Sequence, residues 1–197
     1  MTMSLSCESV LLQDHLLPAC EADHEGMRLA LAQAHLAYQA GEVPVGAIIT
    51  DAQGQQIAAG FNQTISTTDP TAHAEIVALR QAAKVLSNYR LPGLTVYVTL
   101  EPCLMCMGAL FNARIERIVF GAHDAKTGVC GSVLTLQDDT RLNHHAQVQG
   151  GVLADECVAL LRQFFRERRE QARQLREQQR QLLTPLPCVC AGTGTES

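Results

Sequence analysis

Residues 94–106 read LTVYVTLEPCLMC, a run of β-branched and apolar side chains that leads into a proline and two cysteines. The first seven residues predict a buried β-strand, because side chains of this kind are enriched in strands. Pro102 suits the first turn of a helix, which we expect to continue to about Ala113. The sequence therefore places Cys103 and Cys106 at the start of a helix that follows a central strand.

The segments around this unit alternate between helical and extended patterns. We expect Asp23 to cap a first helix, Gly41 to end it, and residues 51–54 to form a hairpin turn. Alternating elements predict an α/β domain of three α/β/α layers, with helices on both faces of a mixed five-stranded sheet. The further predicted elements are helices at 23–39, 73–87 and 155–181, and strands at 45–50, 57–61, 117–121 and 146–149.

Composition indicates one folded domain with extra chain at both ends. The chain has 197 residues, of which 47% are apolar, which is enough for a single hydrophobic core. We expect the domain to span residues 23–181, with a flexible extension at 1–22 and a flexible tail at 182–197. No run of eighteen apolar residues is present, so no membrane span is expected. The first basic residue is Arg28, unlike a secretory or mitochondrial leader, and we expect a cytoplasmic protein.

Charge is unevenly distributed along the chain. The net charge is −5, yet seven Arg and three Glu between Leu160 and Gln181 give that segment a local charge of +4. A basic helix on an acidic body fits a localised contact with phosphates. It equally fits a solvated helix with Arg–Glu pairs along its surface, and charge alone leaves both interpretations open.

Two short segments carry the chemistry, namely His73-Ala74-Glu75 and the Cys103/Cys106 pair. Cysteines three residues apart share one face of a helix, at a spacing that one zinc ion spans. His73 supplies a third ligand, and a fourth position left for water is typical of catalytic zinc, so we expect one zinc per chain. Glu75 is predicted to carry protons between that water and a substrate. A lone C-x-x-C also suits a redox pair or half of a structural zinc site, but the His-x-Glu segment favours catalysis.

Together with their surroundings, these segments resemble bacterial transfer-RNA adenosine deaminases, a branch of the cytidine and deoxycytidylate deaminase superfamily. The resemblance runs from about His24 to Arg169. It rests on the metal motifs and on the following segments: EVPVGA (42–47), DPTAHAE (69–75), NYR (88–90), TLEPCLMC (99–106), DAKTG (124–128), GVLADEC (151–157) and FFRERR (164–169).

The resemblance implies a cytidine-deaminase-like fold and a zinc-dependent hydrolysis of adenosine to inosine at the wobble position of a tRNA anticodon. It also implies a homodimer, and an arginine tRNA with an ACG anticodon as the partner. Asn62 resembles the family's purine-contacting amide, although a buried Asn also suits a loop-holding role. Asp124 resembles the ribose-contacting acid, or alternatively caps a turn. The other residues expected on the substrate side are Ala74, Lys126, Phe165, Arg168 and Arg169.

Several further residues receive provisional roles. Phe164 and Phe165 are expected to pack the last helix against the body, which leaves Arg166, Arg168 and Arg169 free to meet RNA. Glu101 is expected to support the metal ligands from behind. Arg90 and Arg114 suit either phosphate contacts or plain surface positions. The remaining candidates, which we expect at loops or at the substrate rim, are His123, His144 and His145.

Three rival functions share parts of this pattern. A deaminase of free bases or small nucleosides would keep the zinc site but give the Arg-rich helix no role. A structural zinc module or supporting subunit would not need Glu75. A redox protein would use the two cysteines without metal.

Overall fold

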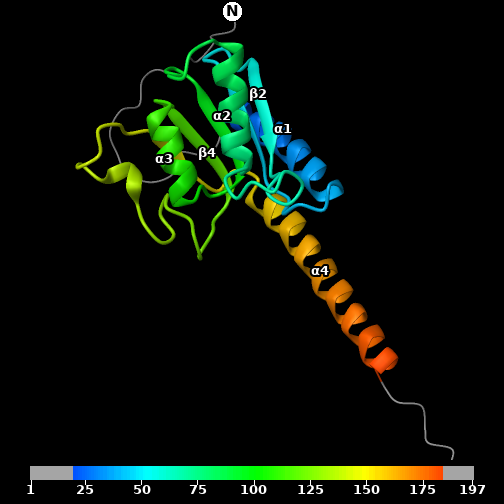
Figure 1. The fold of residues 1–197 in the computed structure, drawn as a ribbon. Helices are drawn as coiled ribbons and strands as arrows, with labels where there is room; N and C mark the ends of the chain where they lie inside the picture. Colours follow the sequence, from blue (N-terminus) through cyan, green and yellow to red (C-terminus); the bar gives the residue numbers. More distant parts are fainter. Residues whose placement is uncertain (1–19, 184–197) are drawn as a thin grey trace, which may run out of the picture.

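A mixed five-stranded sheet forms the centre of the computed structural model, which describes residues 20–183 (Figure 1). The strand order is β2-β1-β3-β4-β5, with β1 antiparallel to both β2 and β3, and with β4 and β5 parallel to β3. The strands are β1 (Gly46–Thr50), β2 (Gln56–Phe61), β3 (Thr95–Leu100), β4 (Arg117–Ala122) and β5 (Gln147–Gln149). The helices are α1 (Glu21–Gln39), α2 (Ala74–Val85), α3 (Leu104–Asn112) and α4 (Ala154–Leu183), with a 3-10 turn η1 (Leu136–Asp138).

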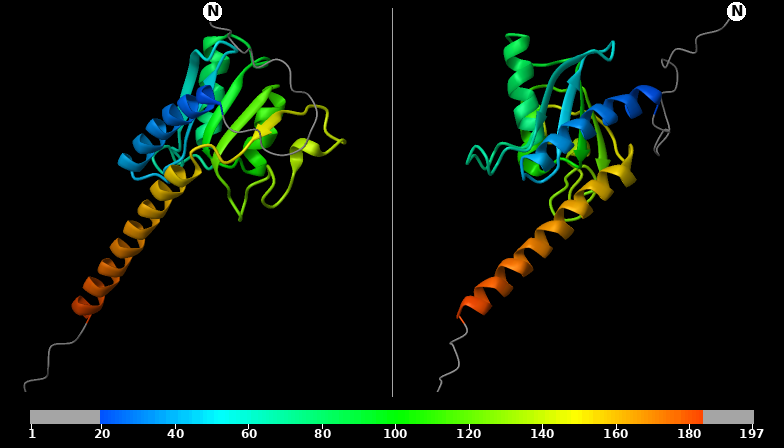
Figure 2. Two further views of the ribbon diagram at one scale, coloured as in Figure 1. Left: turned by 180° about the vertical axis from the view of Figure 1, so that it is seen from behind. Right: turned by 90° about the vertical axis from the view of Figure 1, so that its right-hand side faces the viewer.

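Helices cover both faces of the sheet, as Figures 1 and 2 show. On one face α2 and α3 pack against buried side chains such as Val96, Val98 and Ile118. On the other face α1 and the start of α4 enclose Ile48 and Tyr97. Alternate residues of β3 therefore enter opposite cores, as its period of two requires. The expected three-layer α/β/α fold is confirmed.

Gly60 on β2 allows α2 to lie unusually close to the sheet. A Cβ atom at this position would stand 2.6 Å from both the Ala74 carbonyl oxygen and the Ala78 backbone nitrogen, which is inside contact distance. The absence of a side chain thus sets the position of the first turn of α2. This turn is where the His-x-Glu segment lies.

Element boundaries differ from expectation mainly at the N-terminus. Helix α1 begins at Glu21 with Cys20 as its N-cap residue, so Asp23 does not stand at the predicted N-cap position. It contributes to the cap from the third helical position, where its carboxylate accepts a hydrogen bond from the Cys20 backbone N–H at 3.4 Å. The same carboxylate accepts hydrogen bonds from the Arg117 guanidinium at 2.5 and 2.9 Å. Gly41 does follow the end of α1, with a φ of 76° that favours glycine. The predicted extension therefore ends at residue 20 or earlier, and α4 continues two residues beyond 181.

The predicted tails lie mostly at 1–19 and 184–197, outside the described residues, and so does the Cys188-Val189-Cys190 segment. Their flexibility stays a prediction. Within residues 20–183 no helix is long and apolar enough to cross a membrane.

Candidate active site

The ends of two helices bring the three expected metal ligands together. His73 Nδ1 lies 3.7 Å from Cys103 Sγ and 3.4 Å from Cys106 Sγ, and all three ligand atoms lie within 4.8 Å of one another. With Zn–N of about 2.1 Å and Zn–S of about 2.3 Å, tetrahedral geometry requires N···S separations of roughly 3.6 Å. The three side chains therefore fit zinc and leave one coordination position for a small ligand.

The local fold explains why these ligands meet. His73 and Cys103 are the N-cap residues of α2 and α3, each with extended backbone angles that turn the side chain away from its helix. Cys106 follows in the first turn of α3 and is fully buried. The free N–H groups and the positive end of each helix favour the thiolate form that a metal requires.

Electrostatics at the ligands follow from their mutual contacts. Hydrogen bonding from the Cys106 thiol lowers the pKa of Cys103 to about 4, against the opposing effect of burial. The same hydrogen bond and burial raise the pKa of Cys106. The contact with Cys103 raises the pKa of His73. The contacts among these side chains thus favour the thiolate form of Cys103, which is the form that binds a metal.

Glu75 lies beside the ligands in a pocket of about 230 Å³. Its side chain is almost fully buried, and this burial raises the pKa of its carboxyl group. A carboxyl group with a raised pKa is suited to take up and release a proton near neutral pH. The residues that line the pocket are Val43, Val45, Asn62, Thr64, His73, Glu75, Leu100, Glu101, Cys103, Asp124 and Thr127.

Asn62 follows β2 and enters this pocket. Its Oδ1 accepts a hydrogen bond of 2.9 Å from the Ala74 backbone N–H, in the first turn of α2. Asn62 therefore holds the first turn of α2, a structural role related to the expected loop-holding one, while its contact with a purine stays a prediction. The Ala74 methyl group is fully buried, and Ala74 is not among the pocket-lining residues of the described chain, so its expected contact with substrate gains no support.

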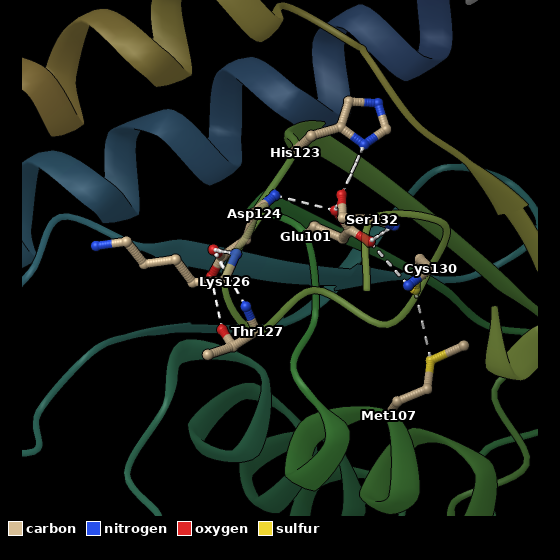
Figure 3. A network of polar contacts seen from close by, with 8 residues as sticks. All are labelled: Glu101, Met107, His123, Asp124, Lys126, Thr127, Cys130 and Ser132. Carbon is tan, nitrogen blue, oxygen red and sulfur yellow. Dashed lines mark hydrogen bonds and ion pairs between the residues drawn. The ribbon is translucent and has the colours of Figure 1, made fainter. Parts of the chain in front are cut away.

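Asp124 forms the turn that was its alternative interpretation. Its carboxylate accepts hydrogen bonds from the Lys126 backbone N–H at 2.9 Å and from the Thr127 hydroxyl at 2.6 Å (Figure 3). Burial opposes ionisation, but these donors prevail and lower the pKa of Asp124. The residue still lines the pocket, while the ammonium group of Lys126 points away from Glu101 in Figure 3.

Glu101 organises the loop that carries Asp124. Its buried carboxylate accepts hydrogen bonds from the backbone N–H groups of Asp124, Cys130 and Ser132, at 3.0, 2.8 and 3.1 Å, and from the Ser132 hydroxyl (Figure 3). Burial would raise the pKa of Glu101, but this set of donors lowers it. Glu101 was expected to support the metal ligands. Its hydrogen bonds go instead to the loop that forms the pocket wall.

Glu42 is a buried residue whose support of the pocket wall the sequence analysis did not predict. Its buried carboxylate accepts hydrogen bonds from the backbone N–H groups of Ile65 and Ser66, at 2.9 and 2.7 Å, and from the Thr64 hydroxyl at 3.2 Å. Thr64 and Asp124 both line the pocket and belong to different loops. Glu42 holds the loop of Thr64, and Glu101 holds the loop of Asp124. In the sequence, Glu42 is recognisable only as an acidic residue next to an apolar run, and that pattern does not predict a buried carboxylate between two loops.

Helix α4 partly contradicts its expected roles. Phe164 is buried, but Phe165 is 44% exposed and so does not pack into the core. Arg168 is not free, because its guanidinium donates to the Gly41 carbonyl and lies over the Phe164 ring. These contacts fix α4 to the end of α1.

The remaining candidates stabilise loops within the described chain. Arg114 donates to Asn143 at 3.2 Å, and His144 contacts the Ile115 carbonyl oxygen at 2.7 Å. His123 is exposed, and it lies 3.4 Å from both Glu101 and the Ser132 hydroxyl (Figure 3). None of them joins the metal ligands.

Comparisons with known proteins agree with this site. Residues 20–122 match the family model of the cytidine and deoxycytidylate deaminase zinc-binding region. The chain is 52% identical over 151 residues to the tRNA-specific adenosine deaminase of Haemophilus influenzae, covering 77% of this chain and 87% of that protein. It is 42% identical over 151 residues to the Bacillus subtilis protein of the same description, covering 77% and 93%.

Solved structures extend the comparison to the fold. A structure from a study of A-to-I editing by tRNA:A34 deaminases superposes with a TM-score of 0.67 and 40% identity, covering 69% of this chain and 98% of the other. Guanine deaminase from Nitrosomonas europaea superposes with a TM-score of 0.61 and 26% identity, covering 76% and 86%. The same scaffold therefore carries deamination of more than one purine.

Proposed function

Because the chain belongs to the tRNA-specific adenosine deaminases, within the cytidine and deoxycytidylate deaminase zinc-binding family, we propose that it deaminates adenosine at the wobble position of a tRNA anticodon. The reaction adds water to adenosine and releases inosine and ammonia. The observation that carries the proposal is the arrangement of His73, Cys103 and Cys106 around one point, with Glu75 in the same pocket.

The chain's own residues supply metal binding and proton transfer. His73 Nδ1 and the sulfur atoms of Cys103 and Cys106 would hold the zinc ion. Bound there, zinc would make water a nucleophile near neutral pH by lowering its pKa. Glu75 is placed to accept a proton from the attacking water and to deliver it to the ring nitrogen N1 of adenine. It then takes up the proton of the new C6 hydroxyl group and passes it to the departing amine, which leaves as ammonia. Its raised pKa suits both directions of transfer.

Asn62 and Asp124 are proposed to orient the nucleoside. Asn62 lines the pocket and uses only its Oδ1 in the contact with Ala74, which leaves its amide NH₂ for a purine acceptor. Asp124 lines the same pocket from the opposite loop and suits a ribose hydroxyl. Lys126, Phe165 and Arg169 remain proposed contacts to the surrounding RNA, whereas the Arg168 guanidinium is already engaged by the Gly41 carbonyl and the Phe164 ring. An anticodon loop is partly unstacked already, so extruding one base costs less there than in a duplex.

A homodimer, an arginine tRNA with an ACG anticodon and a cytoplasmic location complete the proposal. Support for self-association comes from an apolar hollow of about 420 Å³ between α2 and α3. Tyr89, which lines this hollow, is 68% exposed. An exposed apolar hollow of this kind is typical of a protein contact.

The test is incubation of the zinc-loaded protein with an arginine-type anticodon stem-loop that carries adenosine at the wobble position. We expect a mass gain of about one dalton at that nucleotide, and its loss in Glu75→Gln with zinc content unchanged. Free adenosine, cytidine and guanine serve as competing substrates. Turnover of a free base or nucleoside with no turnover of the stem-loop would move the assignment toward the guanine deaminase type. Stable zinc binding without any turnover would indicate a supporting subunit.

A further inference from the structure

Helix α4 extends far beyond the body that it packs on (Figure 2). Its first turns are held by Cys157, Leu160 and Phe164, which are all buried. From residue 165 to residue 180 every side chain is exposed. Packing against the domain therefore does not explain the sequence of this part of the helix. The residue pattern must reflect contact with solvent or with a binding partner.

The arginines of α4 form one continuous stripe. They recur at intervals of four, three, four, three and four residues, which keeps them within a band about 80° wide at 3.6 residues per turn. The band is roughly 27 Å long and lies on the side of the helix roughly opposite the three buried residues. The members of this arginine stripe are Arg162, Arg166, Arg169, Arg173, Arg176 and Arg180.

The acidic residues do not interrupt this stripe. Glu167, Glu170 and Glu177 fall on one flank of it at helical spacing. Contacts cross the boundary: Arg173 lies 2.9 Å from Glu170, and Glu177 and Arg180 also have interaction partners. A helix that needed only solubility would distribute both signs around its surface, whereas this one gathers six of its seven arginines on one side.

The helix leaves the body at the rim of the active-site pocket. Arg168 donates to the Gly41 carbonyl, and Gly41 lies two residues before Val43, which lines the pocket. An RNA loop whose nucleotide enters the pocket must continue into the stem that flanks it. The projecting part of α4 therefore starts close to the pocket that would receive the nucleotide.

We propose that the arginine stripe binds the phosphate backbone of the RNA stem adjoining the edited loop, with Arg173, Arg176 and Arg180 reaching the part of the stem farther from the loop. This inference rests on the proposed function, since it needs RNA as the substrate. A guanidinium group suits the role because it pairs with phosphate oxygens in a bidentate manner. Contacts with phosphates do not depend on base sequence. They would therefore extend the length of RNA that the protein contacts without making binding specific for one stem sequence.

The experiment compares hairpins that share one anticodon loop and differ in stem length. The test variant is Arg173→Gln/Arg176→Gln/Arg180→Gln, which keeps good helix formers and removes three charges. The matched control is Gln171→Ala/Gln178→Ala/Gln179→Ala, which changes three residues on the other side of the same helix segment. Circular dichroism and turnover of the shortest hairpin report that each variant is folded.

We expect the wild-type protein and the control to bind longer stems more tightly, and the test variant to lose this gain. With about 0.9 counterions released per phosphate contact, three contacts make wild-type binding about 40-fold more sensitive to a salt increase from 50 to 200 mM than binding by the variant. Equal salt dependence of the two proteins would overturn the proposal, as would an equal affinity loss on short and long stems. A change in oligomeric mass with unchanged RNA affinity would assign the stripe to self-association instead. Failure of the wild-type protein to deaminate any hairpin would instead contradict the proposed function.

Discussion

Asn62 Oδ1 accepts a hydrogen bond from the Ala74 backbone N–H, and this links the residue after β2 to the first turn of α2. Ala74 stands between the metal ligand His73 and the acid Glu75. Among residues 20–183 the Asn62 Nδ2 atom has no hydrogen-bond partner, although Asn62 lines the pocket. One side chain therefore holds the helix through its oxygen and is positioned to bind substrate through its nitrogen.

Two substitutions at Asn62 separate these roles. Asn62→Ala leaves the Ala74 N–H unpaired, which we expect to cost about 1–3 kcal/mol of unfolding free energy and to weaken zinc binding. Asn62→Asp keeps an acceptor at a helix N-terminus, where negative charge is favourable, but removes the NH₂ donor. We expect Asn62→Asp to retain zinc and stability while kcat/KM falls about 10- to 100-fold. Zinc analysis, urea unfolding and steady-state kinetics distinguish the two, and a fully active Asn62→Asp would remove Asn62 from substrate binding.

Gly60 determines how closely α2 approaches the sheet. In Gly60→Ala the new methyl group would stand 2.6 Å from two backbone atoms of α2, so the helix must shift. Such overpacking costs about 1–3 kcal/mol, and here it displaces the helix that begins at His73. We expect a lower urea midpoint together with weaker zinc binding.

Gly108 provides the control for this substitution. It lies within α3 with no atom within 4 Å of a built Cβ, so Gly108→Ala should raise stability by up to about 1 kcal/mol. Loss of zinc in both variants, or in neither, would contradict the role assigned to Gly60.

The sequence predicted the elements and the metal ligands well, for reasons visible in particular residues. LTVYVTL is buried on both faces, so its composition alone marked a central strand. The ligands His73, Cys103 and Cys106 lie at helix starts, where local spacing carries the information. Local sequence patterns therefore predict structure over one helical turn or one strand.

Contacts between distant segments were not predictable in the same way. Glu42 meets residues 65 and 66, and Glu101 meets residues 124, 130 and 132, through backbone N–H groups that have no residue-type signature. The Asp23–Arg117 pair joins positions 94 residues apart, and a capping role was the only one that local sequence suggested. The family resemblance supplied roles for Asn62 and Asp124, but only the structure shows which atoms of each are already engaged.

Glu101 is expected to act as a positioning residue for the loop that carries Asp124. In Glu101→Gln one acceptor oxygen becomes an NH₂ group that faces backbone N–H donors, so the loop over residues 123–132 should loosen. We expect KM to rise several-fold with zinc content unchanged, and faster hydrogen exchange at the Cys130 amide. Ser132→Ala removes one hydroxyl contact only and should show a smaller effect. If Glu101→Gln lowered kcat through loss of zinc, the residue would belong to the metal site instead.

The Asp23–Arg117 pair predicts how stability depends on acid. The Asp23 side chain is 3% exposed; burial alone would raise its pKa, but the hydrogen bonds and charge of Arg117 prevail and lower it below 3.8. A carboxyl group whose pKa is depressed on folding stabilises the protein fully above its unfolded pKa, and this contribution disappears as pH falls through the folded value.

Asp23→Asn should therefore cost about 2–3 kcal/mol near neutral pH, at the low end for a buried pair because Arg117 is 29% exposed. Urea unfolding should show this gap unchanged between about pH 5 and pH 7 and narrowing below about pH 4, where Asp23 of the unfolded wild-type chain begins to bind a proton while the folded carboxylate is still ionised. Glu25→Gln, which removes an exposed partner of Arg28 on the same helix, should leave stability unchanged across this range. A gap between Asp23→Asn and wild type that stayed constant down to pH 3 would show that the ionised pair contributes nothing beyond its hydrogen bonds.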